Sequence, residues 1–299
     1  MSIKRVFEYF PKLGPHLKKG ECGRIAVVGG ALEYTGAPYF SAMAPMKIGA
    51  DLSYLFCPIE AAAVIKTYSP ELIVHPSQEF EKIDGMIGRI DSLVIGPGLG
   101  RDKEKLVPLL RKILNRVRNQ GTLSVVIDAD GLFLLADCID EVKACPNVIL
   151  TPNHREFDRL YEIVFGGQKP QGDITKQVQK LAKELRVIIF RKGEEDIITD
   201  GEKTEIGKEQ GCDRRCGGQG DLLSGTIALF SYWVRLKEGT SSIKSEHLIL
   251  GGHLASDFIR FCSRERLGVI PVSCGRLDPS VSRREKPCVL AELIESKNR

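Results

Sequence analysis

The sequence predicts an α/β fold: a single three-layer α/β/α domain with a mostly parallel central sheet covered by helices on both faces. Two observations carry this prediction. Short apolar runs rich in Val and Ile alternate with helical patterns along the chain, which is typical of parallel strands joined by helices. Several of these runs end in clusters of Gly, Asp and Asn, at the edge where open α/β sheets bind ligands.

The first part of the chain is predicted to be a strand–helix–strand unit. An apolar run at residues 24–28 ends in two glycines and precedes a helix of small residues through positions 42–48. A second strand follows at residues 51–57 and is closed by a proline. The glycines after the first strand lack the three-glycine spacing of the dinucleotide fingerprint, so we predict no NAD site of the Rossmann type.

The alternation continues to the end of the expected domain. Two β-rich runs at residues 197–206 flank an Asp-Gly pair, which is typical of a hairpin. No repeat or linker divides the chain, so residues 1–299 are expected to form one domain, with a tail of unassigned role after about residue 268. The other expected strands are residues 72–75, 92–95, 124–127, 148–150 and 187–190, and the other expected helices are residues 6–10, 61–68, 103–117, 222–234 and 247–261.

Composition limits the classes of function. A net charge of +4 over 299 residues is too small to predict a nucleic-acid surface. The N-terminus opens no secretory signal, and no apolar run approaches the roughly 20 residues of a membrane helix. The cysteines are odd in number and irregularly spaced, which favours reduced thiols and a cytoplasmic location, with a mitochondrial one left open. No Cys or His pair completes a zinc set with Cys212 and Cys216.

Residues 216–225 place four glycines at a point where a helix is expected to begin. The N–H groups and the dipole of a helix start form an anion site, most naturally for phosphate. Asp221 lies in the same turn and would repel phosphate unless it removes a proton from an attacking hydroxyl group. The alternative is a glycine-rich helix entry in which Asp221 is a capping residue.

Four expected strand ends carry polar or glycine-rich clusters, at residues 96–100, 128–131, 153–156 and 192–193. Because the carboxyl ends of parallel strands lie at one edge of the sheet, these clusters predict a single ligand site. Ordinary turn chemistry explains any one of them. Their number, together with the glycine–Asp helix start, favours the site.

Five segments of the chain carry a resemblance to a known family. They are Tyr34-Thr35-Gly36-Ala37-Pro38-Tyr39, Gly96-Pro97-Gly98-Leu99-Gly100-Arg101, Asp128-Ala129-Asp130-Gly131-Leu132, Thr151-Pro152-Asn153-His154-Arg155-Glu156-Phe157, and Arg214-Arg215-Cys216-Gly217-Gly218-Gln219-Gly220-Asp221. The last segment resembles the Gly-X-Gly-Asp anion hole of ribokinase-like kinases. All five, in this order, resemble those of the ATP-dependent NAD(P)H-hydrate dehydratases, a family with the ribokinase-like fold, and the two arginines and the cysteine before the glycines are similar to its eukaryotic branch.

The resemblance implies a lyase that repairs nicotinamide nucleotides. ATP, with Mg²⁺, would phosphorylate the ring hydroxyl of the S epimer of hydrated NADH or NADPH (NADHX or NADPHX), and elimination would release ADP and phosphate and restore the reduced cofactor. The chain is too short for the epimerase domain of many bacterial relatives, so a separate epimerase is implied, and a homo-oligomer is compatible with the family. The alternative is a ribokinase-like kinase for a hydroxymethylpyrimidine, a thiazole alcohol or pyridoxal. A nucleotide sensor without turnover is a third hypothesis, which the presence of Asp221 disfavours.

The resemblance also implies residue roles. Asp221 would be the base, and the amides of Gly218 and Gly220 would hold the developing charge on the phosphoryl group. Glu156 would reach Mg²⁺ through water, with helix capping as the alternative; no direct metal ligand is predicted, and His154 is assigned no proton transfer. The implied ATP-binding residues are Lys192, Gly193, Glu194, Glu195, Asp196, Gly211, Cys212, Asp213, Arg214, Arg215, Cys216, Gly217, Gly218, Gln219 and Gly220. The implied substrate-binding residues are Gly98, Gly100, Asn153, His154, Arg155, Glu156, Phe157, Asp158, Arg159 and Asp221.

Overall fold

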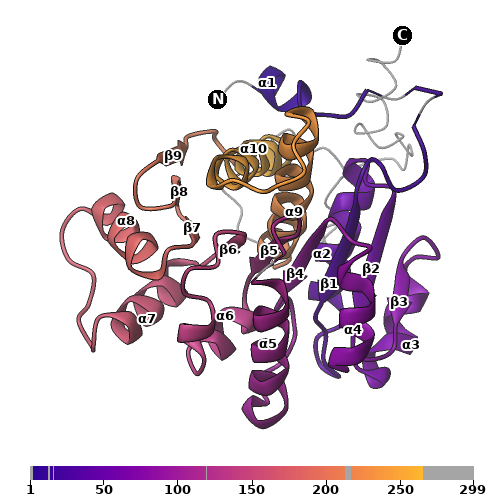
Figure 1. Cartoon of the computed structure of the whole chain (residues 1–299), viewed down its shortest axis with the longest axis horizontal. Helices are drawn as coiled ribbons and strands as arrows, with labels where there is room; N and C mark the ends of the chain where they lie inside the picture. The colour runs from indigo at the N-terminus through magenta and orange to yellow at the C-terminus, as the bar shows by residue number, and fades with distance from the viewer. Residues whose placement is uncertain (1–2, 13, 16, 119, 213–216, 265–299) are drawn as a thin grey trace, which may run out of the picture.

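Nine strands form one sheet in the computed structural model, which describes residues 3–12, 14–15, 17–118, 120–212 and 217–264 (Figure 1). The order is β3-β2-β1-β4-β5-β6-β7-β8-β9, in which β1 to β7 pair in parallel and β8 and β9 are antiparallel. The strands are β1 (Arg24–Val28), β2 (Leu52–Phe56), β3 (Ile73–His75), β4 (Ser92–Ile95), β5 (Ser124–Ile127), β6 (Val148–Leu150), β7 (Ile188–Arg191), β8 (Asp196–Thr199) and β9 (Thr204–Gly207).

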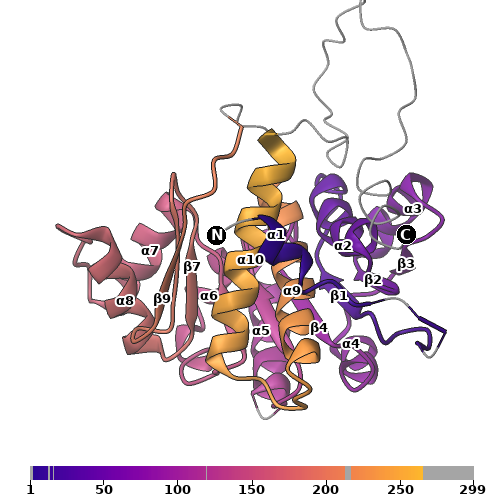
Figure 2. The same cartoon turned by 90° about the horizontal axis from the view of Figure 1, so that it is seen from above.

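Helices cover both faces of the sheet, so the three layers predicted from the sequence are confirmed (Figure 2). One face packs against α1 (Ile3–Phe7), α2 (Gly36–Ile48), α3 (Ile59–Tyr68), α9 (Gln219–Lys237) and α10 (Ser245–Arg264). The other packs against α4 (Phe80–Ile87), α5 (Lys103–Val117), α6 (Asp130–Leu135), α7 (His154–Val164) and α8 (Ile174–Leu185), with a 3₁₀ turn at Ile139–Glu141. Within the described residues, no helix combines the length and the apolar character needed to cross a bilayer.

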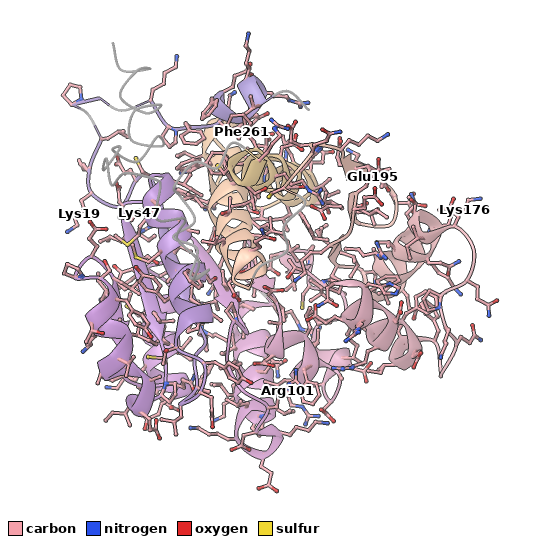
Figure 3. All side chains as sticks on the ribbon, turned by 180° about the vertical axis from the view of Figure 1, so that it is seen from behind. Lys19, Lys47, Arg101, Lys176, Glu195 and Phe261 are labelled. Carbon is pink, nitrogen blue, oxygen red and sulfur yellow. The ribbon has the colours of Figure 1, made fainter. Side chains whose placement is uncertain are left out.

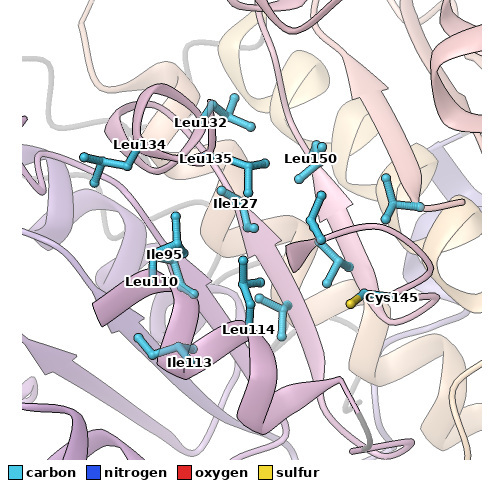
Figure 4. Close-up of a cluster of buried hydrophobic side chains, with 14 of the residues drawn as sticks. Ile95, Leu110, Ile113, Leu114, Ile127, Leu132, Leu134, Leu135, Cys145 and Leu150 are labelled. Carbon is cyan, nitrogen blue, oxygen red and sulfur yellow. The ribbon is translucent and has the colours of Figure 1, made fainter. Parts of the chain in front are cut away.

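Successive side chains of each central strand enter opposite cores. In β1, Ala26 and Val28 belong to the core beneath α5, whereas Ile25 and Val27 belong to the core beneath α2 and α9. This alternation follows from the two-residue period of a strand, and it explains why strands covered on both faces are apolar throughout. Figure 4 shows part of the first core, where Ile95 and Ile127 pack with Leu110 and Leu114 of α5.

The expected strands and the hairpin are confirmed to within one or two residues, but four helices were not among the expected elements: α4, α6, α7 and α8. Two of them begin inside clusters that were predicted only as strand-end turns. α6 begins at Asp130 and α7 at His154, because each strand end turns directly into a helix. At α7 the reason is local: Asn153 caps the helix and Glu156 completes the capping box.

The strand order reverses next to β1, which lies between β2 and β4. In such sheets ligands bind beyond the carboxyl ends of the strands. The carboxyl ends of β4, β5, β6 and β7 carry the four predicted clusters, and the parallel pairing places them at one edge. The tail after about residue 268 lies outside the described residues.

Candidate functional site

The glycine-rich stretch does begin a helix, as predicted. Gly218 is the N-cap residue of α9, with φ of 90°, a left-handed conformation that favours glycine. A Cβ atom there would lie 3.0 Å from the ring of Phe40. Gly220 and Asp221 follow in the first turn, whose N–H groups have no acceptor within a helix. The start of α9 therefore has the geometry of an anion site.

Close packing against α2 fixes the position of this helix start. A Cβ atom on Gly225 would lie only 2.0 Å from the carbonyl oxygen of Ser41, so any larger residue there would separate the two helices. At the same crossing, the hydroxyl groups of Ser41 and of Ser224, the residue before Gly225, lie 3.1 Å apart, within hydrogen-bonding distance. Gly225 thus serves helix packing, and the glycines before it serve the backbone turn.

Lys192 joins three strand ends. It follows β7, and its Nζ donates to Oδ1 of Asp128, at the end of β5, over 2.6 Å. Thr151, at the end of β6, donates its hydroxyl to the same oxygen over 2.8 Å. The Lys192 side chain is only 20% exposed, so it is not a solvated lysine at a strand end. Burial disfavours the ammonium ion, but Asp128 and Glu156 outweigh burial and raise the pKa of Lys192.

Asp221 lies beside this group of charges. A Cβ atom on the neighbouring Gly220 would lie 3.8 Å from Lys192 Nζ, so the first turn of α9 faces the lysine. Burial raises the pKa of Asp221 to about 7; Asp128 and Asp130 act in the same direction, and Lys192 opposes them. A carboxyl group that titrates near neutral pH suits a general base, because it is partly ionised and still binds a proton well.

The glycine-rich loop after β4 packs against the end of β5. A Cβ atom on Gly96 would lie 1.9 Å from the carbonyl oxygen of Asp128, so only glycine fits. The amide of Gly100 donates to Asp130 over 3.1 Å. Between the two aspartates, Ala129 adopts φ of 48° and ψ of −118°, a strained conformation for a residue with a side chain. Such strain is commonly concentrated at functional sites.

The start of α7 combines capping with a charged contact. Asn153 accepts a hydrogen bond from the amide of Glu156 over 3.1 Å, and Glu156 accepts one from the amide of Asn153 over 2.8 Å. The capping alternative for Glu156 is therefore confirmed. The same carboxylate lies 3.9 Å from Lys192 Nζ. Burial raises the pKa of Glu156, and Lys192 opposes the shift.

The remaining predicted substrate residues of α7 are not gathered into one place. Phe157 is fully buried in the core, and Arg155 is exposed. His154 and Asp158 line a separate cavity of about 220 Å³ with residues of the α7–α8 connection.

Two predicted segments do meet at the ring of Phe133. The guanidinium carbon of Arg159, on α7, lies 5.2 Å from its centroid, and that of Arg101, after β4, lies 4.8 Å from it. Gly98, in the same loop after β4, has a φ of 59° and packs against Tyr34 and Pro38, at the start of α2. Figure 3 shows Arg101 at the opposite end of the molecule from Phe261 of α10.

The predicted ATP-binding residues fall into two groups. Glu194 and Glu195 are exposed in the turn between β7 and β8, whereas Asp196 is buried and supports that turn by accepting from the amide of Gly193 over 2.9 Å. After β9, the amide of Cys212 donates to Ser263 of α10. Residues 213–216, which include Asp213, Arg214, Arg215 and Cys216, lie outside the described residues. Gly217 is exposed beside α9.

Asp128 and Thr151 contribute to this geometry although no role was predicted for them, and so does Arg260, on α10, whose Nε donates to the buried carboxylate of Asp196 over 3.0 Å. The position of Asp128 directly after a buried strand was visible, but its pairing with a lysine 64 residues away was not. Arg260 lies in a helix with a regular amphipathic pattern, and nothing in that pattern marks it. Contacts between distant segments are set by the tertiary fold, which a local pattern does not encode.

Comparison with known proteins agrees with the resemblance. The model of the NAD(P)H-hydrate dehydratase family matches residues 25–249. A protein from Ixodes scapularis named ATP-dependent (S)-NAD(P)H-hydrate dehydratase is 46% identical over 228 residues, which cover 76% of this chain and 73% of that protein.

Two solved structures share the fold. A ribokinase-like superfamily protein from Enterococcus faecalis superposes with a TM-score of 0.68 at 23% identity, over 86% of this chain and 85% of that one. The ADP/ATP-dependent NAD(P)H-hydrate dehydratase from Bacillus subtilis, co-crystallised with ATP and Mg²⁺, superposes with a TM-score of 0.67 at 17% identity. The superposition covers 99% of this chain and 95% of that one. The fold is therefore ribokinase-like. The family match over most of the sequence, with the 46% identity to the Ixodes protein, shows that this chain belongs to the NAD(P)H-hydrate dehydratase family.

Proposed function

We propose that this chain catalyses the ATP-dependent dehydration of the S epimer of hydrated NADH and NADPH, which returns them to NADH and NADPH. Membership of the family supports this reaction. The observation that carries the mechanism is Asp221, a carboxyl group with a pKa of about 7 in the first turn of a glycine-led helix, facing a buried lysine.

The proposed reaction has two stages. Asp221 takes the proton of the ring hydroxyl as its oxygen attacks the γ-phosphorus, and ADP leaves. The amides of Gly218 and Gly220 and the Lys192 ammonium stabilise the charge on the transferred group. Phosphate is a better leaving group than hydroxide, so the C–O bond then breaks, phosphate leaves with the bonding electrons, and a neighbouring ring proton passes to water, which restores the double bond.

Mg²⁺ fits this site as a partner of the phosphates. Within the part of the chain that the structure describes, no three His, Cys, Asp or Glu side chains gather as a metal site. Mg²⁺ in nucleotide sites usually keeps several waters and takes few protein ligands. We propose that Glu156, in addition to capping α7, holds the ion through water, and the ion would screen the negative charge of the phosphates.

We extend the proposal to the supply of the substrate, the domain organisation and the location of the protein. The hydrate exists as two epimers, and a site that acts on one requires a separate epimerase to supply it. We propose one domain over residues 1–299 and a cytoplasmic location. Assembly into a homo-oligomer stays a prediction.

The experiment follows the absorbance of NADH and the release of phosphate after addition of ATP and Mg²⁺ to purified NADHX. The dehydratase should form one NADH and one phosphate per ATP. A ribokinase-like kinase would instead consume ATP, leave a stable phosphate ester and recover no NADH. ATP consumption with a phosphate ester of a pyrimidine, thiazole or pyridoxal substrate would favour that alternative.

A further inference from the structure

Arg260, on α10, connects two segments predicted to bind ATP. Its Nε and Nη2 bind the carboxylate of Asp196 over 3.0 and 2.9 Å. Nη2 also donates to the carbonyl oxygen of Gly193 over 2.8 Å, and Nη1 donates to that of Glu194 over 2.8 Å. A weaker contact of 3.5 Å reaches the carbonyl oxygen of Glu209, in the segment after β9. One side chain thus spans the β7–β8 turn and the β9 exit.

We propose that Arg260 is a positioning residue for the nucleotide: it fixes the turn at residues 192–196 and the segment at residues 208–212 in the arrangement that binds ATP. This inference rests on the proposed function and on the predicted ATP-binding residues, which include residues 192–196 of the first segment and Gly211 and Cys212 of the second. Neither segment contains Arg260, and no role was predicted for it.

The contacts of Arg260 set the direction of two backbone amides. In a trans peptide the N–H group points away from the carbonyl oxygen of the preceding residue. Because Arg260 holds the carbonyl groups of Gly193 and Glu194, the N–H groups of Glu194 and Glu195 point away from α10. Among the described residues neither amide has an acceptor in the protein. Successive amides that point outward from a turn form an anion-binding surface, which suits a nucleotide phosphate.

α10 provides a rigid base for this arrangement. Phe258 and Leu254 are buried, and Gly252 allows the helix to approach Phe190 of β7, where a Cβ atom would lie 3.1 Å from the ring. One turn before Arg260, Ser256 donates its hydroxyl to Asp196 over 2.7 Å. The helix therefore carries both side chains that bind Asp196, and it is packed against the sheet.

A lysine at position 260 separates positioning from simple charge pairing. Arg260→Lys keeps a cation beside the buried carboxylate of Asp196, but a single ammonium group cannot bind Asp196 and the carbonyl groups of both segments at once. The two segments would then have to be ordered when ATP binds, which weakens binding. We expect the KM for ATP to rise about tenfold, which corresponds to roughly one or two additional groups immobilised on binding.

The matched control is Arg24→Lys. Arg24 binds Asp91 through Nε and Nη2, both at 3.0 Å, but at the amino-terminal ends of β1 and β4, away from the predicted site. Both variants lose one bidentate pair. The measurements are the steady-state constants for ATP and NADHX and the rise in melting temperature caused by Mg²⁺ and ATP.

Arg260→Lys should raise the KM for ATP, reduce the ATP-induced rise in melting temperature, and leave the KM for NADHX within about twofold. Arg24→Lys should lower stability and keep both KM values. A wild-type KM and a wild-type ATP shift in Arg260→Lys, or an equal rise in both KM values, would overturn the proposal. The melting shift needs no turnover, so it tests Arg260 even if the proposed reaction is not observed.

A double variant covers the case in which the single variant does not fold. Asp196→Asn with Arg260→Gln removes both charges, so no buried carboxylate is left without its cation. It is expected to fold and to retain the weakened response to ATP. A full ATP response in this variant would show that the forked contacts of Arg260 are not needed, which contradicts the proposal.

Discussion

At the scale of single residues, burial raises the pKa of Asp221, and charges on other elements adjust it. Asp128 follows β5, Asp130 begins α6, and Lys192 follows β7; the aspartates favour the protonated form of Asp221 and the lysine favours the ionised one. Glu156, on α7, also lies beside Lys192. The protonation of Asp221 is therefore adjustable from positions that do not take part in proton transfer.

Opposite shifts of the pH profile test this electrostatic arrangement. Lys192→Met removes the cation that lowers the pKa of Asp221. The acidic limb of the pH profile of kcat/KM should therefore move to a higher pH than its wild-type position near pH 7. Asp128→Asn removes a carboxylate that raises this pKa and releases Lys192, so the limb should move to lower pH. Profiles of kcat/KM from pH 5 to 9 measure both shifts. If the acidic limb is unchanged in both variants, or moves in the same direction in both, the assignment of Asp221 as the base is contradicted.

Asp221 should also cost stability at neutral and alkaline pH. Its pKa rises from 3.8 in the unfolded chain to about 7 in the folded one, so between these values the folded state binds the additional proton. Stability from this group is therefore present below about pH 4 and is lost as the pH rises through about 7. Asp221→Asn should stabilise the protein by about 2 kcal/mol at pH 8, and by much less at pH 4.

Denaturant titrations of the wild type and Asp221→Asn at the two pH values measure this difference. Asp200→Asn is a suitable control because Asp200 accepts from the amides of Glu202 and Lys203 in the β8–β9 turn and is not among the charges that shift the pKa of Asp221. Equal stability of Asp221→Asn and the wild type at pH 8 would mean that Asp221 is not buried as an ionised group.

At the scale of elements, the strands could be predicted from the sequence, but the helix α7 and the contact between Lys192 and Asp128 were not predicted. Val- and Ile-rich runs covered on both faces have one simple structural solution, so residues 24–28 and 124–127 appear where they were expected. Helix capping was the alternative predicted for Glu156, but α7 itself was not among the expected helices, although the capping box of Asn153 and Glu156 is a local signal for its start. The contact of Lys192 with Asp128 had no local signal, because it depends on which strands become neighbours.

A pair of glycine substitutions tests the packing of α9. Gly225→Ala places a Cβ atom 2.0 Å from the carbonyl oxygen of Ser41, so α2 and α9 must separate and stability should fall by about 2–3 kcal/mol. Gly85→Ala, within α4, meets no atom within 4 Å and should stabilise by about 0.5–1 kcal/mol. Thermal unfolding of both variants measures the contrast. Equal behaviour of the two variants is incompatible with the close crossing of α2 and α9.

At the scale of the whole molecule, the sheet brings together groups that are distant in the sequence. Parallel pairing of β4 to β7 places the ends of four strands at one edge, and α9 adds its first turn to them. α10 supports two segments from outside this edge through Arg260. The α/β architecture and the gathering of four polar clusters at one edge of the sheet followed from the sequence. The pairing of charges within the site required the fold.

The measurement that tests the central claim most directly is the recovery of NADH from NADHX by the Asp221→Asn variant, with ATP and Mg²⁺ present. Removing a general base is expected to lower kcat by about 10²–10⁴-fold, while the ATP-induced rise in melting temperature remains. That result would assign Asp221 to proton transfer in an otherwise intact nucleotide site. Recovery of NADH at nearly the wild-type rate would contradict the proposed mechanism.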